Sequence, residues 1–483
     1  MIEVLAVASE IYPVVKTGGL ADVAGALPVA LKPHRVSTRT LVPGYRQVME
    51  RLGRTRQVAV IKSLFGGKAV LLAGRVKNLD LIVIDAPHLY DRAGGPYVDP
   101  KGADWPDNWA RFAALGWTGA ALARGLIEGY QPEVVHAHDW QGAMAAVYLR
   151  YGGAAGTRSV LTIHNLAFQG QFGAQVFPGL KLPAAAQAMD GIEYFGGVGF
   201  LKGGLASADA ITTVSPTYAR EIRTPEFGMG LDGLLNLRLN DLTGIANGID
   251  TAEWDPQTDK ALVANYTSAQ VNLRERNKRA LERRFGLTPG EGPLFAAVTR
   301  LTWQKGMDLL AEAADRLVAL GGRLAVLGAG DAALEAAMRA AAARHPGRIG
   351  VQIGYDEKLS HLIQGGADAI VIPSRFEPCG LTQLYGLRYG CVPVVSRVGG
   401  LNDTVIDANY AAVEAGVPTG VQFAPVTALA LADALARTTA LYAEPRIWRK
   451  MQRRGMKADV SWTRSAARYA ALYASLTSSG LTE

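Results

Sequence analysis

The chain has 483 residues, of which 49% are apolar, and a formal net charge of +7. This length exceeds a single ordinary core and predicts two domains. No uninterrupted apolar run approaches the ~18 residues that a bilayer-spanning helix needs, so the sequence argues against a membrane protein. A total of 50 basic residues against 43 acidic ones is a mild surplus that does not require a nucleic-acid partner.

Cysteine use and the N-terminus both predict a cytoplasmic protein. Cys379 and Cys391 lack Cys-x-x-Cys spacing and a second pair that would complete a zinc site, which favours a reducing compartment without disulfides. The first apolar run, residues 2–8, is short, carries Glu3 and has no basic segment before it. A strand is therefore favoured over a signal peptide.

The first half of the chain alternates short β-rich runs with helical stretches, which is typical of a parallel sheet covered by helices on both faces. The predicted helices include residues 109–126 and 141–151. The predicted strands are residues 2–8, 36–41, 81–85, 133–138, 159–163 and 210–214.

The second half repeats this alternation after a polar exit segment around Asn247. It predicts helices over residues 307–320 and 332–344 and a helical tail over 447–476. The predicted strands are residues 294–299, 323–327, 349–353, 369–372 and 393–395. We therefore expect an α/β protein with doubly wound domains at 1–245 and 246–456, and a C-terminal helix in 457–483 that packs back on the first domain.

The densest basic segment, residues 274–284 (RERNKRALERR), mixes cations with acids and apolar residues at helical spacing. The spacing favours a solvated helix face over a nucleic-acid contact.

Residues 16–23 (KTGGLADV) follow the first strand and open a helix. A lysine and two glycines at such a junction let an ammonium and main-chain N–H groups converge on an anion. Residues 399–405 (GGLNDTV) repeat this spacing. This repeated spacing suggests two similar halves of the chain. Whether residues 399–405 contact a ligand stays open.

A second cationic segment follows the predicted strand 294–299. Arg300 and Lys305 lie between this strand and the next helix. An arginine fork and a compact ammonium suit a diphosphate, although solvated surface cations are the plain alternative.

Glu377 follows the predicted strand 369–372. The N–H groups of residues 379–382 open the next helix and can hold an anion. A carboxylate beside a phosphate site most simply contacts sugar hydroxyls, and a helix-start acid is the alternative. Cys379 has no identifiable histidine partner, so a nucleophilic role is disfavoured.

Polar residues also end strands in the first half. His136 and His138 share one face, but no third ligand for a metal is evident. His164 could bond a substrate hydroxyl or be a structural histidine. Aromatic residues near these ends could stack on sugar rings or simply pack: Tyr97, Trp105, Trp109, Trp140, Phe168 and Phe172. The sequence contains neither Asp-x-Asp nor a P-loop, which disfavours a metal-held nucleotide and a P-loop NTPase.

Taken together, the motifs resemble the bacterial glycogen synthases, ADP-glucose-dependent α-1,4-glucan glucosyltransferases that are similar to plant starch synthases. The matching stretches run through the chain in the expected order: residues 9–13, 16–23, 136–140, 161–170, 247–250, 300–306, 374–382 and 399–405. The resemblance implies a GT-B fold, with two Rossmann-like domains facing across a deep cleft. It also implies retention of the α configuration, no metal or other cofactor, and a glycogen or malto-oligosaccharide acceptor.

The resemblance also implies roles for individual residues. Arg300, Lys305, Glu377 and His164 are the catalytic candidates, with the two cations on the donor diphosphate. The acceptor candidates are Glu10, Tyr97 and Trp140. The candidates for binding the substrate are Lys16, Gly18, Gly19, Asp22, Asp139, Asn165, Asn247, Tyr355 (near adenine), Cys379, Gly380, Leu381 and Thr382.

One position departs from the pattern of many related transferases. Eight residues after Glu377 these enzymes carry a second glutamate, and this chain has Tyr385. A two-glutamate mechanism is therefore not assigned. Other GT-B enzymes, such as a phosphorylase or a sucrose or trehalose-phosphate synthase, and a non-enzymatic glucan- or nucleic-acid-binding protein, remain alternatives.

Overall fold

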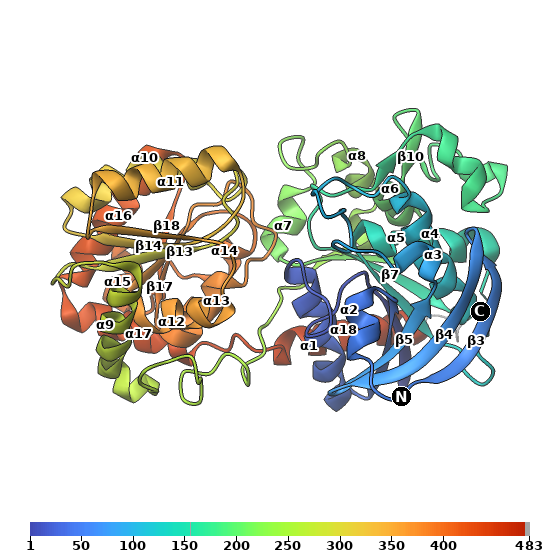
Figure 1. Cartoon of the computed structure of the whole chain (residues 1–483), viewed down its shortest axis with the longest axis horizontal. Helices are drawn as coiled ribbons and strands as arrows, with labels where there is room; N and C mark the ends of the chain where they lie inside the picture. The colour runs from blue at the N-terminus through green and yellow to red at the C-terminus, as the bar shows by residue number, and fades with distance from the viewer. Residues whose placement is uncertain (155, 479–483) are drawn as a thin grey trace. The chain divides into compact units, whose positions relative to one another are not determined.

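The computed structural model describes residues 1–154 and 156–478. The chain forms two compact units, unit 1 (residues 1–247 and 462 onward) and unit 2 (residues 248–461). Figure 1 shows an α/β architecture in each unit, which confirms the expected fold class. None of the helices that the structure describes combines the length and apolar composition needed to span a bilayer.

Unit 1 is built on a nine-stranded sheet in the order β12-β11-β7-β6-β1-β2-β5-β4-β3. The strands from β12 to β5 run parallel, and β4 is antiparallel to both of its neighbours. The strands are β1 (Ile2–Val7), β2 (Val36–Pro43), β3 (Arg56–Leu64), β4 (Gly67–Val76), β5 (Leu79–Asp85), β6 (Val134–His138), β7 (Arg158–Ile163), β11 (Ala210–Thr213) and β12 (Leu242–Gly244). A small separate sheet contains β8 (Gln171–Phe172), β9 (Glu193–Tyr194) and β10 (Gly197–Gly199).

Alternate residues of β1 face opposite sides of this sheet, so both faces are covered. Leu5 and Val7 pack in a core with α4 and α5, while Val4 packs in a second core with α1 and α18. The helices of unit 1 are α1 (Gly19–Leu31), α2 (Arg46–Arg51), α3 (Pro87–Tyr90), α4 (Asn108–Ala123), α5 (Asp139–Gly152), α6 (Phe200–Ser207), α7 (Pro216–Glu221), α8 (Asp232–Leu237) and α18 (Thr463–Ser478), with 3₁₀ turns η1 (Lys32–His34), η2 (Ala174–Leu180), η3 (Ala184–Ala186) and η4 (Leu239–Asp241).

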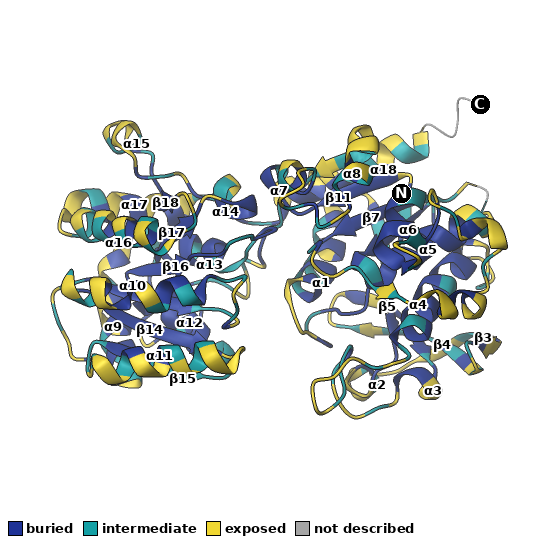
Figure 2. Cartoon of the chain, turned by 90° about the horizontal axis from the view of Figure 1, so that it is seen from above, coloured by how far each residue is buried: buried dark blue, intermediate teal, exposed yellow. Residues whose placement is uncertain are grey.

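Unit 2 has a six-stranded parallel sheet in the order β15-β14-β13-β16-β17-β18. In β13, Phe295 and Ala297 face the core formed with α10 and α16, while Leu294 and Ala296 face the core formed with α9 and α12. The strands are β13 (Leu294–Val298), β14 (Arg323–Gly328), β15 (Ile349–Ile353), β16 (Ala369–Ile372), β17 (Val392–Ser396) and β18 (Val421–Phe423). The helical elements are η5 (Ser268–Leu273), α9 (Arg274–Phe285), α10 (Met307–Ala319), α11 (Ala332–Arg344), α12 (Glu357–Gly366), α13 (Thr382–Tyr389), α14 (Gly399–Thr404), α15 (Tyr410–Ala415), α16 (Ala428–Tyr442) and α17 (Pro445–Lys457). Figure 2 shows the buried strands in dark blue and the exposed outer surfaces of many helices in yellow.

The helical tail differs from its prediction. Residues 447–476 were expected to be one helical stretch, but α17 ends at Lys457 and α18 begins at Thr463. The expected boundary at residue 456 therefore falls inside α17, and the chain re-enters unit 1 at Trp462. There Tyr469 and Tyr473 are buried against α1 and the end of the sheet.

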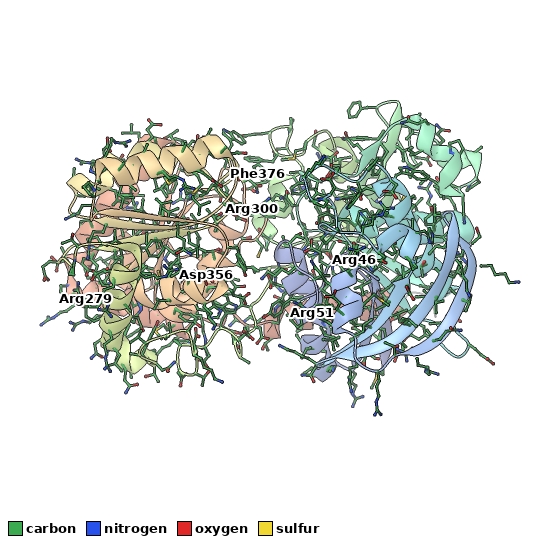
Figure 3. All side chains as sticks on the ribbon, viewed as in Figure 1. Arg46, Arg51, Arg279, Arg300, Asp356 and Phe376 are labelled. Carbon is green, nitrogen blue, oxygen red and sulfur yellow. The ribbon has the colours of Figure 1, made fainter. Side chains whose placement is uncertain are left out.

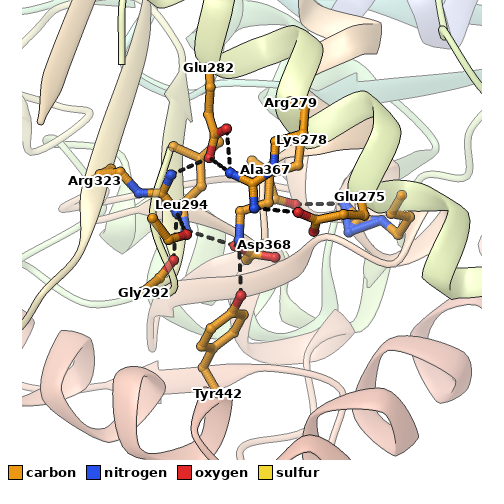
Figure 4. A network of polar contacts seen from close by, with 12 residues as sticks. Glu275, Lys278, Arg279, Glu282, Gly292, Leu294, Arg323, Ala367, Asp368 and Tyr442 are labelled. Carbon is orange, nitrogen blue, oxygen red and sulfur yellow. Dashed lines mark hydrogen bonds and ion pairs between the residues drawn. The ribbon is translucent and has the colours of Figure 1, made fainter. Parts of the chain in front are cut away.

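The prediction of a solvated face for residues 274–284 was wrong for one side of α9. Arg274, Lys278 and Glu282 are buried. Lys278 Nζ lies 2.8 Å from Asp368 Oδ2, and Glu282 pairs with the buried guanidinium of Arg323, as Figure 4 shows. The segment is thus an internal ion-pair network with one exposed edge. Unpaired charges would be costly at this depth, so these partners are needed.

Candidate active site

Each sheet has a point where the strand order reverses, and the candidate residues follow the strands that meet there. In unit 2 that point lies between β13 and β16, and in unit 1 between β1 and β6. Ligands of open α/β sheets bind outside the carboxyl ends of such strands. In unit 2, Arg300 and Lys305 follow β13, and Glu377 follows β16; Figure 3 labels Arg300 and Phe376 at this edge.

Lys305 and Glu377 form an ion pair. Lys305 Nζ lies 2.5 Å from Glu377 Oε2, and the Ser374 hydroxyl donates to the same oxygen at 2.9 Å. Glu377 Oε1 accepts no hydrogen bond from the described residues. The carboxylate is thus fixed by one oxygen, and the other is available to a ligand hydroxyl. Lys305 keeps two N–H donors for an anion.

Arg300 is exposed, and its guanidinium forms no ion pair or side-chain hydrogen bond with any residue that the structure describes. Arg300 precedes Lys305 by five residues in the same loop. A planar fork with no internal partner is suited to bind phosphate oxygens from solution.

The two loops at this edge are joined directly. Arg375 donates its main-chain N–H to Gln304 O at 2.8 Å and pairs through both guanidinium nitrogens with Asp308. The Arg375 guanidinium also lies 4.4 Å from the centre of the Trp303 ring. Sequence reasoning missed Arg375 and Ser374, because their partners are more than 60 residues away or share no recognisable spacing.

The second Gly-Gly pair packs beneath the Glu377 loop. A Cβ on Gly399, whose φ is +42°, would lie 1.9 Å from Glu377 O, and one on Gly400 would lie 2.2 Å from Cys379 O. Gly400 also donates its N–H to Glu377 O at 3.1 Å. The second Gly-Gly pair thus lets the chain pack closely against the loop that carries Glu377.

Three donors open α13. The main-chain N–H groups of Gly380, Leu381 and Thr382 donate to no acceptor in the described parts of the chain, and all three residues are half-buried. Unpaired N–H groups at the positive end of a helix attract an anion. Cys379 is buried beside them. Tyr355 lies apart, on the loop after β15, where it is exposed and its hydroxyl donates to Glu357.

In unit 1, the residues of the β1–α1 loop contact one another. Lys16 Nζ lies 2.7 Å from Asp22 Oδ1, so these two candidate residues form an ion pair. Gly18 caps α1 and Gly19 is its first residue. The Gly18 N–H, expected to bind the donor, points to Glu10 Oε2 at 3.3 Å, which is a long hydrogen bond.

Asp139 opens α5 directly after β6, with a φ of +54°. Its Oδ1 accepts the main-chain N–H groups of His164 (2.8 Å) and Asn165 (3.3 Å), so these three predicted residues lie together. Burial raises the pKa of Asp139 to about 7 despite these hydrogen bonds. His138 Nδ1 lies 3.0 Å from His164 Nε2, and burial lowers the pKa of His138 to about 4 and that of His164 well below its usual range.

Of the remaining candidates of unit 1, His136 and Trp140 contact other side chains of the protein. His136 bonds the Tyr473 hydroxyl and Thr162 Oγ1 through its two ring nitrogens. Trp140 packs against Phe112 and other aromatic rings of the core. Asn247 ends unit 1, and its side-chain oxygen has no hydrogen-bond partner among the described residues. Across residues 1–154 and 156–478, no group of three or more His, Cys, Asp or Glu residues is placed to hold a metal ion.

Two doubly wound units, each with polar residues at its switch point, are the architecture of the GT-B glycosyltransferases. The family models agree: "Starch synthase catalytic domain" matches residues 3–237, and "Glycosyl transferases group 1" matches residues 278–454. The chain belongs to the bacterial glycogen synthase family. It is 63% identical to a glycogen synthase of Mesorhizobium japonicum over 98% of both chains, and 60% identical to glycogen synthase 1 of Rhizobium meliloti over 99% and 100% of the two chains.

Solved structures agree with this assignment. The catalytic domain of starch synthase IV from Arabidopsis thaliana, bound to ADP and acarbose, matches with a TM-score of 0.90 and 31% identity over 99% of both chains. A sucrose-phosphate synthase from Thermosynechococcus elongatus matches with a TM-score of 0.60 at 18% identity, covering 99% of this chain and 100% of the other, which reflects a shared fold alone.

Proposed function

We propose that the chain is a cytoplasmic glucosyltransferase that moves glucose from ADP-glucose to the non-reducing end of an α-1,4-glucan, such as glycogen or a malto-oligosaccharide. The acceptor O4 forms the new bond to C1 of glucose and loses its proton. The bond from C1 to the phosphate oxygen breaks, and ADP leaves. The α configuration is retained.

The observation that carries this proposal is the set of donors beside Glu377. Arg300 has no internal partner among the described residues, Lys305 keeps two donors, and three N–H groups open α13. Negative charge grows on the departing phosphate in the transition state, and preorganised donors stabilise that charge more than they stabilise the ground state. These groups supply the stabilisation that a metal ion gives in other transferases.

Glu377 orients the donor sugar in this account. Its Oε2 is held by Lys305 and Ser374, so Oε1 accepts a glucose hydroxyl. Replacement of Glu377 by Gln keeps the shape and removes the charge. We expect a lower rate and weaker donor binding, and a normal rate with normal donor affinity would refute this role.

Unit 1 supplies the remaining proposed contacts. Lys16 binds the donor, and His164, neutral because burial depresses its pKa, hydrogen-bonds a sugar hydroxyl through Nδ1, the nitrogen that His138 does not contact. Asp139 keeps this segment in place, because its Oδ1 accepts the main-chain N–H groups of both His164 and Asn165.

The substrate test offers ADP-glucose or UDP-glucose, each with glycogen, and follows release of the nucleotide. Release from ADP-glucose that depends on glycogen supports the proposal. A preference for UDP-glucose would move the chain to a neighbouring donor class, and no release from either would overturn the proposal.

A further inference from the structure

A buried carboxylate lies under the exposed β1–α1 loop. Glu10 is 3% exposed, whereas residues 16–19 are all exposed. Glu10 Oε1 accepts the hydroxyls of Thr17 (2.6 Å) and Tyr97, and Oε2 accepts the main-chain N–H groups of Thr17 and Gly18. Donors from two segments about 80 residues apart therefore meet on one side chain.

These four hydrogen bonds fill the capacity of the carboxylate. An ionised carboxylate offers about four lone-pair sites, and all four are used. No lysine or arginine of the described chain lies within ion-pair distance of Glu10, so the hydrogen bonds alone compensate its burial. Glu10 cannot accept a sugar hydroxyl without releasing one of its present donors, which argues against the predicted acceptor role.

Tyr97 is fixed at the other end of this network. Its hydroxyl donates to Glu10 and lies 2.8 Å from Ser9 Oγ. Asn108 Nδ2 donates to Tyr97 O at 2.9 Å, and Arg111 Nη1 donates to Pro96 O at 2.8 Å. The first turn of α4 therefore fixes the Tyr97 segment, which in turn fixes Glu10.

We infer that Glu10 is a positioning residue that holds the loop of Lys16 and Gly18 in its binding geometry, and that Tyr97 orients the Glu10 carboxylate. Neither residue is assigned to the glucan. The inference rests on the proposed function, since it takes Lys16 as a donor-binding group. Displacement of such groups by about 1 Å can cost on the order of 100-fold.

The test compares E10Q with E133Q. The Gln amide nitrogen cannot accept, so E10Q leaves at least one loop donor or Tyr97 unpaired. Glu133 is a matched control in the same unit, because its Oε2 also accepts a main-chain N–H, that of Glu3 at 2.9 Å. We expect E10Q to raise KM for ADP-glucose about 10- to 100-fold, with KM for maltohexaose changed less than about twofold, and E133Q to leave both constants unchanged.

A conservative pair at Thr17 sharpens the test. T17S keeps the hydroxyl that Glu10 accepts and should retain the wild-type KM for ADP-glucose. T17V removes this hydroxyl and should raise KM for ADP-glucose toward the value of the E10Q variant. A purely structural role would instead lower the thermal midpoint and the active fraction without separating the two KM values.

Hydrogen–deuterium exchange gives a readout that does not depend on activity. Residues 16–19 should exchange faster in E10Q than in wild type, and at the wild-type rate in E133Q. If E10Q raises KM for maltohexaose alone, or matches E133Q in kinetics and exchange, the inference is overturned while the proposed function stands. A wild-type enzyme that does not use ADP-glucose would refute the proposed function instead, and the exchange comparison would still decide the role of Glu10.

Discussion

Lys305 and Arg300 follow the same strand and are proposed to bind the same diphosphate, yet their replacement by Ala should have different effects on stability. The Lys305 and Glu377 side chains are 16% and 9% exposed and are paired at 2.5 Å. Arg300 is exposed and contacts no acid within the described chain. K305A therefore leaves the largely buried carboxylate of Glu377 without its cation, whereas R300A removes no ion pair within the described chain.

Breaking a buried ion pair by removing one partner costs about 3–5 kcal/mol. Because Ser374 still donates to Glu377 and the pair is not wholly buried, we expect K305A to lower the free energy of unfolding by about 2–3 kcal/mol. For a unit of this size that is a fall of about 4–12 °C in the midpoint. R300A should stay within about 0.5 kcal/mol. Both variants should lose about 100- to 1,000-fold in turnover.

Differential scanning calorimetry measures the midpoints, and hydrogen–deuterium exchange of α13 assigns the loss to unit 2. The double variant K305A/E377Q tests the cause, because a neutral amide no longer needs the lysine. It should recover most of the stability that K305A loses, without recovering activity. The reasoning is refuted if R300A is as destabilising as K305A, or if the double variant is no more stable than K305A.

Three further predictions follow from other contacts. Burial raises the pKa of Asp139 from 3.8 to about 7, so the folded state keeps a proton that the unfolded state loses, and this group's contribution to stability falls as the pH rises from about 4 to about 7. D139N keeps the oxygen that accepts the His164 N–H and should reduce the fall in midpoint between pH 5 and pH 8; an unchanged fall would contradict the assignment. G400A places a Cβ 2.2 Å from Cys379 O and should lose both stability and activity, measured by thermal midpoint and ADP release; wild-type values for both would show that the loop adapts. Dialysis against EDTA should leave the rate unchanged, because Arg300, Lys305 and the N–H groups of α13 stabilise the leaving phosphate; loss of activity that Mg²⁺ restores would contradict this.

The parallel strands could be predicted because buried strands read as apolar runs bounded by turns. The β3–β4 hairpin was missed because one face of it is exposed, so its pattern mixes apolar with polar residues. The break between α17 and α18 was missed as well. Helical periodicity continues across residues 458–462, and only the packing of Trp462 in unit 1 shows that the chain crosses there.

At the candidate site, the sequence indicated which residues follow the switch-point strands but not their partners. The positions of Lys305 and Glu377 could be predicted from strand ends, whereas their pairing depends on how two loops 72 residues apart meet. For the same reason the sequence did not show how Glu10 is hydrogen-bonded. Its four donors come from the β1–α1 loop and from Tyr97, and no local spacing shows that they converge.

The most direct test of the central claim is the product itself. Maltohexaose labelled at its reducing end is incubated with ADP-glucose and the enzyme, and the products are separated by chain length. We expect a ladder of products that differ by single glucose units. An α-glucosidase should remove the added units from the non-reducing end, because each is joined through an α-1,4 bond. Release of ADP without elongation, or a product that resists the α-glucosidase, would contradict it.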